Sequence, residues 1–312
     1  PRVLSASGME AWGMELSVVV PTLNDCEELR GCLDAVTAES PSEIVVVNGP
    51  STDGTSGMVR DRDDVDVLVE IDDRNVNVAR NAGIDRVRGD AVAFLDPTVT
   101  AESGWLGAVA EGLSEADAAT GPTHEQLGAG VATDTVESRT IGGRTVTYFN
   151  GGNVAFSRDL VSELDGFDEY LETGGSRDAA HRIAGLEYDV VWMKEMCVSR
   201  EAAADGGETE RDWRARYRSL SYRLAKNYGL HPTVPFRTLR HAVADAGTTL
   251  RDVARGDARP SAWFGNGRDV ALGSFKGYAD GLRARYADRT PRRNPRGVSI
   301  RNDRAVAVHD RR

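Results

Sequence analysis

Residues 16–24, with the sequence LSVVVPTLN, set the interpretation of the whole chain. The segment from Leu16 to Val20 is short, mostly apolar and rich in β-branched side chains, which is typical of a buried strand. Pro21 ends the run because proline has no N–H to donate to a neighbouring strand. We therefore predict a buried strand followed directly by a turn.

On the C-terminal side of this run, strand-like and helical segments alternate. Strands are predicted over 44–47, 65–71 and 91–95, and helices over 25–38, 76–87 and 103–113. This alternation predicts βαβ units and a mixed, mostly parallel sheet flanked by helices. Ligands of such sheets bind at the carboxyl ends of the strands. We therefore expect the chemistry in the segments after Val20, Val47 and Leu95.

The pattern changes after residue 120. Residues 129–149 indicate a loop and a hairpin with Gly142-Gly143 at its turn, and the chain is predicted to be helical from about residue 210. Apolar stripes begin there at Trp213, Phe236 and Leu272. The predicted organisation is a flexible extension over 1–13, an α/β domain over 14–205, a helical region over 206–290 and a flexible basic tail over 291–312.

The composition limits the class of protein. The 312 residues include 38 Lys+Arg and 49 Asp+Glu, and only three of the basic residues are lysine. An acidic, lysine-poor chain is what we expect of a salt-adapted cytoplasmic protein, although a GC-rich genome also favours arginine. Three dispersed cysteines argue against a disulfide scaffold or a cysteine-rich zinc site. We expect neither a membrane span nor a signal peptide.

The charge is distributed unevenly. Residues 211–312 carry 23 basic and nine acidic side chains, whereas residues 1–210 carry 15 and 40. A basic C-terminal third suggests an anionic partner. Two interpretations stay open: peripheral contact of the basic helices with a membrane surface, or packing of the helices against the acidic domain. Nucleic-acid binding is not expected because the chain shows no known binding module.

Several short motifs follow one another in the first two thirds of the chain. They are VVVPTLN (18–24), STDGT (51–55), ARNAG (79–83), AFLD (93–96) and FNGGNVAF (149–156), which precedes GFDE (166–169). Over about residues 15–195, their order and spacing resemble the inverting glycosyltransferases of family 2, which have the GT-A fold. The resemblance implies a nucleotide-sugar donor bound at the strand ends.

The same resemblance implies a set of donor-binding residues. They are Pro21, Thr22, Asn24, Asn48, Asp53, Arg80, Asn81 and Asp96. Asp53 suits a base or ribose contact, and Arg80 suits the diphosphate. Asn48 stands where the family commonly has an acidic residue, and it can both donate and accept hydrogen bonds. The alternatives are an ordinary strand-ending turn at Pro21 and a surface position for Arg80.

The family's metal motif is altered here. Relatives have Asp-x-Asp, whose carboxylates hold a divalent cation on the donor, whereas this chain has Asp96-Pro97-Thr98. The resemblance therefore implies Mg²⁺ or Mn²⁺ held by Asp96 with Thr98 beside it, and more weakly than by two carboxylates.

The acceptor side is also predicted from the resemblance. Gly151, Gly152 and Asn153 correspond to an acceptor-side loop, and the alternative is a glycine turn. An inverting transfer needs a carboxylate base. The chain offers Asp178, preceded by Arg177 in place of the family's Glu, with His181 on the same helical face to orient the base or bind the diphosphate or a metal. Favourable interaction with the helix dipole is the alternative role for Asp178.

This variant of the motifs resembles a haloarchaeal branch whose members build lipid-linked oligosaccharides for N-glycosylation. We therefore expect transfer of a sugar, with a hexuronic acid as one candidate, from a UDP-sugar to a polyprenyl- or dolichyl-phosphate-linked saccharide, at the inner face of the cell membrane. The alternatives are an inactive donor-binding subunit and a sugar nucleotidyltransferase.

Overall fold

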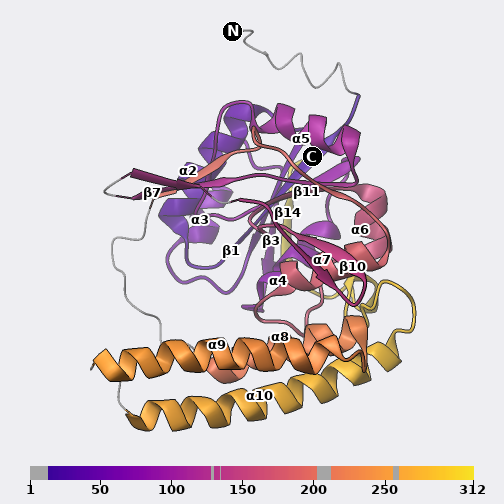
Figure 1. The fold of residues 1–312 in the computed structure, drawn as a ribbon. Coiled ribbons are helices and arrows are strands. Elements are labelled where there is room, and N and C mark those ends of the chain that lie inside the picture. Colours follow the sequence, from indigo (N-terminus) through magenta and orange to yellow (C-terminus); the bar gives the residue numbers. More distant parts are fainter. Residues whose placement is uncertain (1–12, 128–129, 134, 202–211, 256–259) are drawn as a thin grey trace.

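The computed structural model describes residues 13–127, 130–133, 135–201, 212–255 and 260–312. Almost all of the predicted N-terminal extension lies outside these ranges. A sheet with helices on both faces forms the bulk of the molecule, and three long helices run along one side of it (Figure 1). The predicted α/β architecture is therefore confirmed.

Within the described residues, the main sheet has eight strands in the order β12-β6-β11-β4-β1-β2-β3-β14. Their bounds are β1 (Leu16–Thr22), β2 (Glu43–Asn48), β3 (Val67–Ile71), β4 (Ala91–Leu95), β6 (Ala118–Thr120), β11 (Asn153–Ser157), β12 (Val190–Trp192) and β14 (Ala305–Asp310). Strand β1 pairs in parallel with both β2 and β4, and β2 pairs in parallel with β3. The carboxyl ends of these four strands therefore meet at one edge of the sheet.

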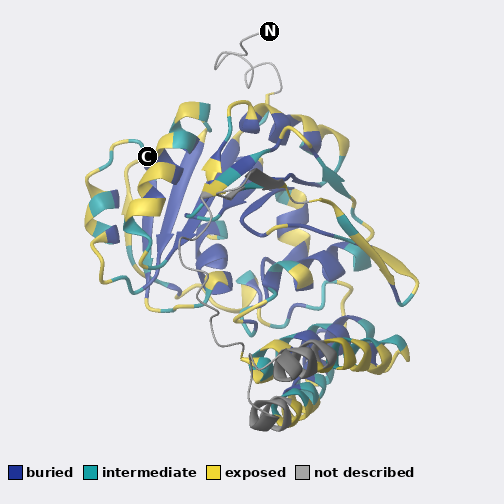
Figure 2. Cartoon of the chain, turned by 60° about the vertical axis from the view of Figure 1, so that its left-hand side comes forward, coloured by how far each residue is buried: buried dark blue, intermediate teal, exposed yellow. Residues whose placement is uncertain are grey.

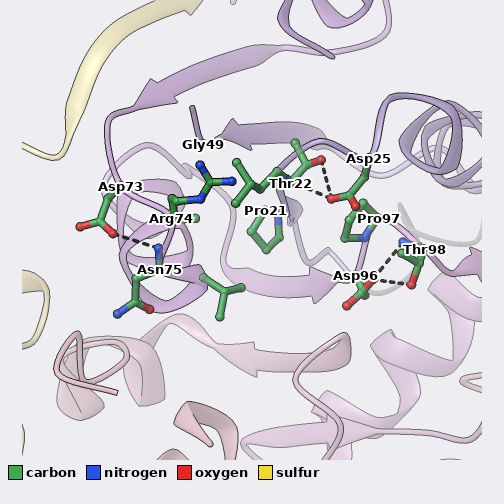
Figure 3. Close-up of a pocket in the computed structure, with 13 residues that line it drawn as sticks. Pro21, Thr22, Asp25, Gly49, Asp73, Arg74, Asn75, Asp96, Pro97 and Thr98 are labelled. Carbon is green, nitrogen blue, oxygen red and sulfur yellow. Dashed lines mark hydrogen bonds between the residues drawn. The ribbon is translucent and has the colours of Figure 1, made fainter. Parts of the chain in front are cut away.

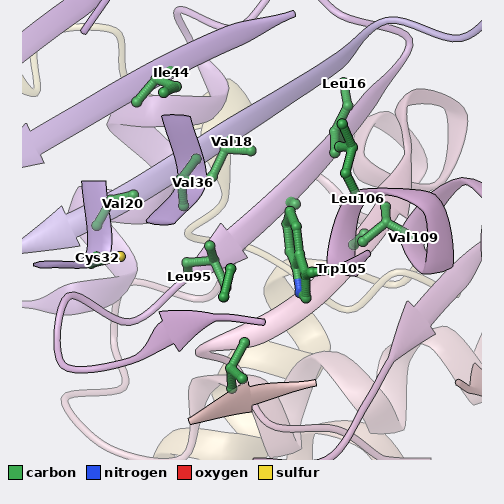
Figure 4. Packing of buried hydrophobic residues seen from close by; sticks show 14 of the residues in the cluster. Leu16, Val18, Val20, Cys32, Val36, Ile44, Leu95, Trp105, Leu106 and Val109 are labelled. Atoms are coloured by element: carbon green, nitrogen blue, oxygen red, sulfur yellow. The ribbon is translucent and has the colours of Figure 1, made fainter. Parts of the chain in front are cut away.

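Helices cover both faces of this sheet. One face packs against α2 (Cys26–Glu39), α3 (Thr55–Arg60) and α5 (Trp105–Glu115), and the other against α4 (Val76–Ile84), α6 (Arg158–Leu164) and α7 (Gly175–Gly185). Val18 and Val20 point into the first layer, where Trp105 also packs (Figure 4), and Val19 points into the second. Because both faces are covered, β1 is buried at every position, as its apolar run predicted.

Two small sheets extend the domain. One contains β5 (Thr100–Ala101), β7 (Thr123–Leu127), β8 (Gly130–Thr133) and β13 (Val198–Glu201). The other is the hairpin of β9 (Glu137–Ile141) and β10 (Arg144–Tyr148). Gly142 and Gly143 at its turn have φ values of 57° and 82°, which glycine adopts without strain. The predicted hairpin is thus confirmed.

The C-terminal helices are α8 (Trp213–Tyr228), α9 (Thr233–Arg255) and α10 (Pro260–Ala287). The apolar stripe of α8 is buried, including Tyr217 and Leu224. The stripe of α9 is different, since Phe236, Leu239 and Val243 are 67%, 61% and 64% exposed. Figure 2 shows exposed residues along the outer side of these helices. No helix in the described ranges is both long enough and apolar enough to span a bilayer.

The C-terminal segment differs from the flexible tail that we predicted over 291–312. It forms a 3₁₀ turn, η1 (Val298–Ile300), and then β14, which pairs antiparallel with β3 and extends the main sheet. Arg304 is only 4% exposed and forms ion pairs with Glu169 and Asp85. Complementary charge on the domain therefore fixes the segment in place.

Candidate active site

A cavity of about 270 Å³ opens at the carboxyl ends of the parallel strands (Figure 3). Its lining comes from the ends of β1, β2, β3 and β4 and from the start of α4. We call it the strand-edge cavity, and its lining residues are Pro21, Thr22, Leu23, Asp25, Gly49, Asp73, Arg74, Asn75, Val76, Ala79, Asp96, Pro97 and Thr98. It lies where the parallel-sheet argument led us to expect a ligand.

Among the residues that line this cavity, Asp96 is the best placed to bind a ligand. Its Oδ1 accepts hydrogen bonds from the Thr98 backbone N–H at 2.9 Å and from the Thr98 hydroxyl at 2.6 Å. Within the described residues, no side chain or backbone donor bonds the other carboxylate oxygen. Thr98 thus orients Asp96 and leaves one of its oxygens available to a ligand.

The predicted nucleotide contacts Asn24, Asn48 and Asp53 do not line the cavity. The Asn24 side chain accepts from the Thr52 N–H, and Asn48 bonds Ser51 and Ser56. Asp53 accepts from the Cys26 N–H and from Thr55, and the Thr55 hydroxyl contributes most to holding the pKa of Asp53 below its usual value. Asn24 and Asp53 thus join the loops after β1 and β2 to each other, whereas Asn48 bonds within the segment that follows β2.

Arg80 lies next to Asp96 but is buried. Its Nη2 donates to the carbonyl of Gly151 at 3.0 Å, and its guanidinium lies 5.0 Å from the centre of the Phe167 ring. Burial lowers the pKa of Arg80 to about 10, and the charge of Asp96 opposes that shift. Arg80 therefore puts a positive charge behind Asp96. Its neighbour Asn81 bonds the backbone of Phe167 and lies away from the cavity.

The glycine loop after β10 packs closely against these groups. A Cβ on Gly152 would lie 2.6 Å from the Asp96 Cβ, and a Cβ on Gly151 would overlap the Ser176 hydroxyl. Glycine is required here because two chain segments approach each other. Asn153 is fully buried, where it accepts from the Trp105 indole N–H and donates to a backbone carbonyl.

Asp178, the predicted base, is fully buried in an ion cluster. Its Oδ2 accepts from Lys226 Nζ at 2.7 Å and from Arg182 Nε at 2.9 Å, and its Oδ1 accepts from the Asn227 amide at 3.0 Å. Burial by itself raises the pKa of Asp178, but Lys226 and Arg182 more than offset this and lower it. A base must reach the acceptor hydroxyl, whereas this carboxylate lines neither the strand-edge cavity nor the cavity described next.

Arg177 and His181 line a second cavity of about 460 Å³. We call it the arginine cavity, since its lining includes Arg139, Arg177, Arg216, Arg223, Arg237 and Arg240. His181 Nδ1 lies 2.8 Å from the Tyr228 hydroxyl. Burial, followed by the charges of Arg223 and Arg237, holds the pKa of His181 well below its usual range, so the ring is neutral at pH 7. His181 lies close to Asp178 along α7 but bonds tyrosines.

The sequence analysis missed several cavity residues. Asp25 accepts from the Thr22 hydroxyl and the Leu23 N–H, and Asp73 accepts from the Asn75 N–H. Asp73, Arg74 and Asn75 directly follow β3. Applying the strand-end rule to that strand as well would have identified them.

The residues fit a divalent cation only in part. Asp96 offers one carboxylate oxygen, and oxygen ligands are what Mg²⁺ and Mn²⁺ prefer. Within the described residues, one cluster with metal-ligating side chains contains Glu102, His124 and Cys197, whose ligand atoms lie within 4.8 Å of one another. That cluster does not include Asp96 or Thr98, so it is separate from the motif predicted to hold the donor's cation.

Comparison with solved structures identifies the fold. The mannosyltransferase PcManGT from Pyrobaculum calidifontis, solved with GDP-Man and Mn²⁺, has a TM-score of 0.54 at 18% identity, covering 86% of this chain and 88% of that one. GalNAc-T7 with UDP, GalNAc and Mn²⁺ has a TM-score of 0.56 at 14% identity, covering 68% and 50%. The fold is therefore that of the GT-A glycosyltransferases.

Sequence comparison finds similarity to the same class of enzyme. Residues 17–159 match the model of glycosyl transferase family 2. Glycosyltransferase AglE of Haloferax volcanii is 28% identical over 236 residues, which are 72% of this chain and 69% of AglE. The pre-mycofactocin glycosyltransferase of Mycobacterium tuberculosis is 26% identical over 226 residues, 65% of this chain and 45% of that protein.

The ion cluster predicts how the free energy of unfolding depends on pH. Lys226→Met removes a buried cation from two buried carboxylates, Asp168 and Asp178, so we expect the free energy of unfolding at pH 7 to fall by about 3–5 kcal/mol. Since the pKa of Asp178 is lowered in the native protein, its contribution is present above the unfolded value of about 3.9 and is lost as the pH falls below it. Urea unfolding from pH 7 to pH 3 measures both effects.

The control is Lys194→Met at an exposed position, which should change stability by no more than about 0.5 kcal/mol. In Lys226→Met, one of the two cations that lower the pKa of Asp178 is missing, so that pKa should be higher than in the native protein. The variant therefore loses less stability as the pH falls, and its deficit relative to the native protein should shrink towards acid pH. A constant deficit at every pH would contradict this account of the cluster.

Proposed function

We propose that this chain transfers a sugar, with inversion, from a nucleoside diphosphate donor bound in the strand-edge cavity. The observation that carries the proposal is Asp96, which is oriented by Thr98, backed by Arg80 and left with one oxygen directed to a ligand. A diphosphate leaving group develops negative charge, and a cation held by Asp96 would neutralise it. The neighbours that contain GDP-Man or UDP with Mn²⁺ support this assignment.

Asp96→Asn tests the donor site. The variant should release nucleoside diphosphate from UDP-GlcNAc or GDP-mannose at least about 100-fold more slowly with Mn²⁺ or Mg²⁺ present, because a cation on the diphosphate supplies several kcal/mol of stabilisation. Asp61→Asn, at an exposed position beyond α3, serves as control and should retain full activity.

If the native chain binds these donors but hydrolyses neither and transfers from neither, it acts as an inactive donor-binding subunit. Release of pyrophosphate would instead indicate a nucleotidyltransferase.

The base assignment remains a prediction, and the ion cluster offers a matched control. Asp178→Asn and Asp168→Asn each remove one fully buried carboxylate that bonds Lys226. If Asp178 is the base, Asp178→Asn should lose transfer by about 100-fold or more while donor binding persists, and Asp168→Asn should not. Measuring kcat, UDP affinity and unfolding free energy for both variants separates the roles. Equal losses of stability and rate would assign Asp178 to structure.

We propose that the acceptor is a phosphate-linked lipid saccharide and that the donor is a UDP-sugar, such as a UDP-hexuronic acid. Similarity to AglE of a haloarchaeon supports this, and so does the acidic, lysine-poor composition, which suits a salty cell interior. An enzyme for such acceptors works at a membrane face. The corresponding location is the cytoplasmic side of the cell membrane.

The outer side of α9 supports that location. Phe236, Leu239 and Val243 recur at i, i+3 and i+7 and are more than half exposed, while Arg237 and Arg240 adjoin them. Apolar and basic side chains together on one helix fit an anionic membrane surface, where the helix lies in the interface. We therefore assign this face of α9 to the membrane.

Vesicle sedimentation tests the assignment. Phe236→Ser combined with Leu239→Ser should weaken binding to phosphatidylglycerol vesicles by about tenfold or more, because two buried apolar side chains are lost from the interface. Ile300→Ser combined with Val306→Ser, at positions 62% and 71% exposed elsewhere on the surface, should have no effect. Self-association through α9 without vesicle binding would contradict the membrane assignment.

A further inference from the structure

The arginine cavity has a large excess of positive charge. Six arginines line it, and Glu137 is its one acidic lining residue. Glu137 already pairs with Arg177 at 2.8 Å and with Arg139 at 3.4 Å. In the part of the chain that the structure describes, Arg223, Arg237 and Arg240 have no carboxylate partner. Like charges brought together without counter-charges repel, so this arrangement favours an anionic ligand.

The buried side of the arginine cavity is also positively charged. Arg223 comes from α8 and packs against Gly174, where a Cβ would collide with its guanidinium. Burial, with the charge of Arg177 added to it, lowers the pKa of Arg223 to about 10, which leaves it charged at pH 7. Arginine binds phosphate through two parallel N–H donors. The cavity therefore has the chemistry of a phosphate or diphosphate site.

Its position relative to the strand-edge cavity is informative. The start of α7 separates the two cavities: Gly174 and Arg177 line the arginine cavity, while Ser176 between them contacts Gly151. The adjoining Gly152 packs against Asp96, which lines the strand-edge cavity. A ligand held by the arginines thus lies one helix turn and one glycine loop away from the proposed donor.

The rim on the solvent side is apolar. On α9, Arg237 and Arg240 face the arginine cavity, and Phe236, Leu239 and Val243 continue from them on the outer side of the helix. A ligand with an anionic head and a hydrocarbon chain matches this sequence of surfaces. A free phosphate would use only the arginines.

We propose that the arginine cavity binds the phosphate or diphosphate group of the acceptor, and that the acceptor's hydrocarbon chain follows the outer side of α9. This inference rests on the proposed function, because it names the part of the acceptor that the enzyme recognises. The site is independent of the donor cavity. Removing its charges therefore weakens acceptor binding and leaves donor binding intact.

Calorimetric titration of the full chain with farnesyl phosphate, inorganic phosphate and farnesol tests the proposal. Farnesyl phosphate should bind more tightly than inorganic phosphate, and farnesol should bind weakly. Arg237→Gln combined with Arg240→Gln should weaken farnesyl phosphate binding by about tenfold or more, because charge-assisted hydrogen bonds are lost. The affinity for UDP should change less than about twofold, because neither arginine lines the strand-edge cavity proposed for the donor.

Arg283→Gln, on α10 with its side chain 80% exposed, is the matched control and should bind every probe as the native chain does. Unchanged farnesyl phosphate affinity in the double variant would overturn the site. Equal affinity for inorganic phosphate and farnesyl phosphate would overturn the lipid part. Failure of the native chain to bind UDP counts against the proposed function alone, because the phosphate titrations are read without any donor.

Discussion

A single buried lysine connects the two parts of the molecule. Lys226 on α8 donates to Asp168 at 2.6 Å and to Asp178 on α7 at 2.7 Å, and all three side chains are fully buried. Tyr222 donates to the same oxygen of Asp168. A buried charge is tolerated only when it is paired and hydrogen-bonded. This cluster therefore fixes α8 against α7, and with it the position of every arginine that the helical region directs toward the domain.

Because of this cluster, neighbouring residues at the start of α7 have different roles. The first turns of α7 supply Ser176 to the glycine loop and Arg177 to the arginine cavity, while Asp178 points inward to Lys226. At the strand edge, the Asp96 carboxylate is paired with the Thr98 hydroxyl. The three carboxylates that line the strand-edge cavity thus lie on one side of the start of α7, and the arginines of the arginine cavity lie on the other.

Local sequence patterns predicted most of the fold but not the contacts between segments that are distant in the sequence. The β-rich runs and their terminal Pro21 and Asp96 were sufficient to place the strands and the cavity, because strand ends of a parallel sheet share one edge. The alternation in β14 was also visible, but its Arg- and Pro-rich surroundings suggested a frayed tail. Pairing with β3 is a tertiary effect. In the same way, Asn48 and Asp53 stand at the predicted edge, yet their hydrogen bonds to Ser56 and to the Cys26 N–H hold them outside the cavity lining. The partner of Asp178 lies on α8, beyond the family motifs, so no local signal indicated its burial.

Strand β14 gives the chain an order of assembly. During synthesis, β3 has a neighbour on one side only until the entire helical region has emerged and the chain has returned to cover the other side. An open strand edge is a template for unwanted pairing, and contacts between distant segments form slowly. The acidic surroundings of the domain reduce that hazard, because like-charged nascent chains repel each other during the interval. The high negative charge can thus protect folding as well as solubility.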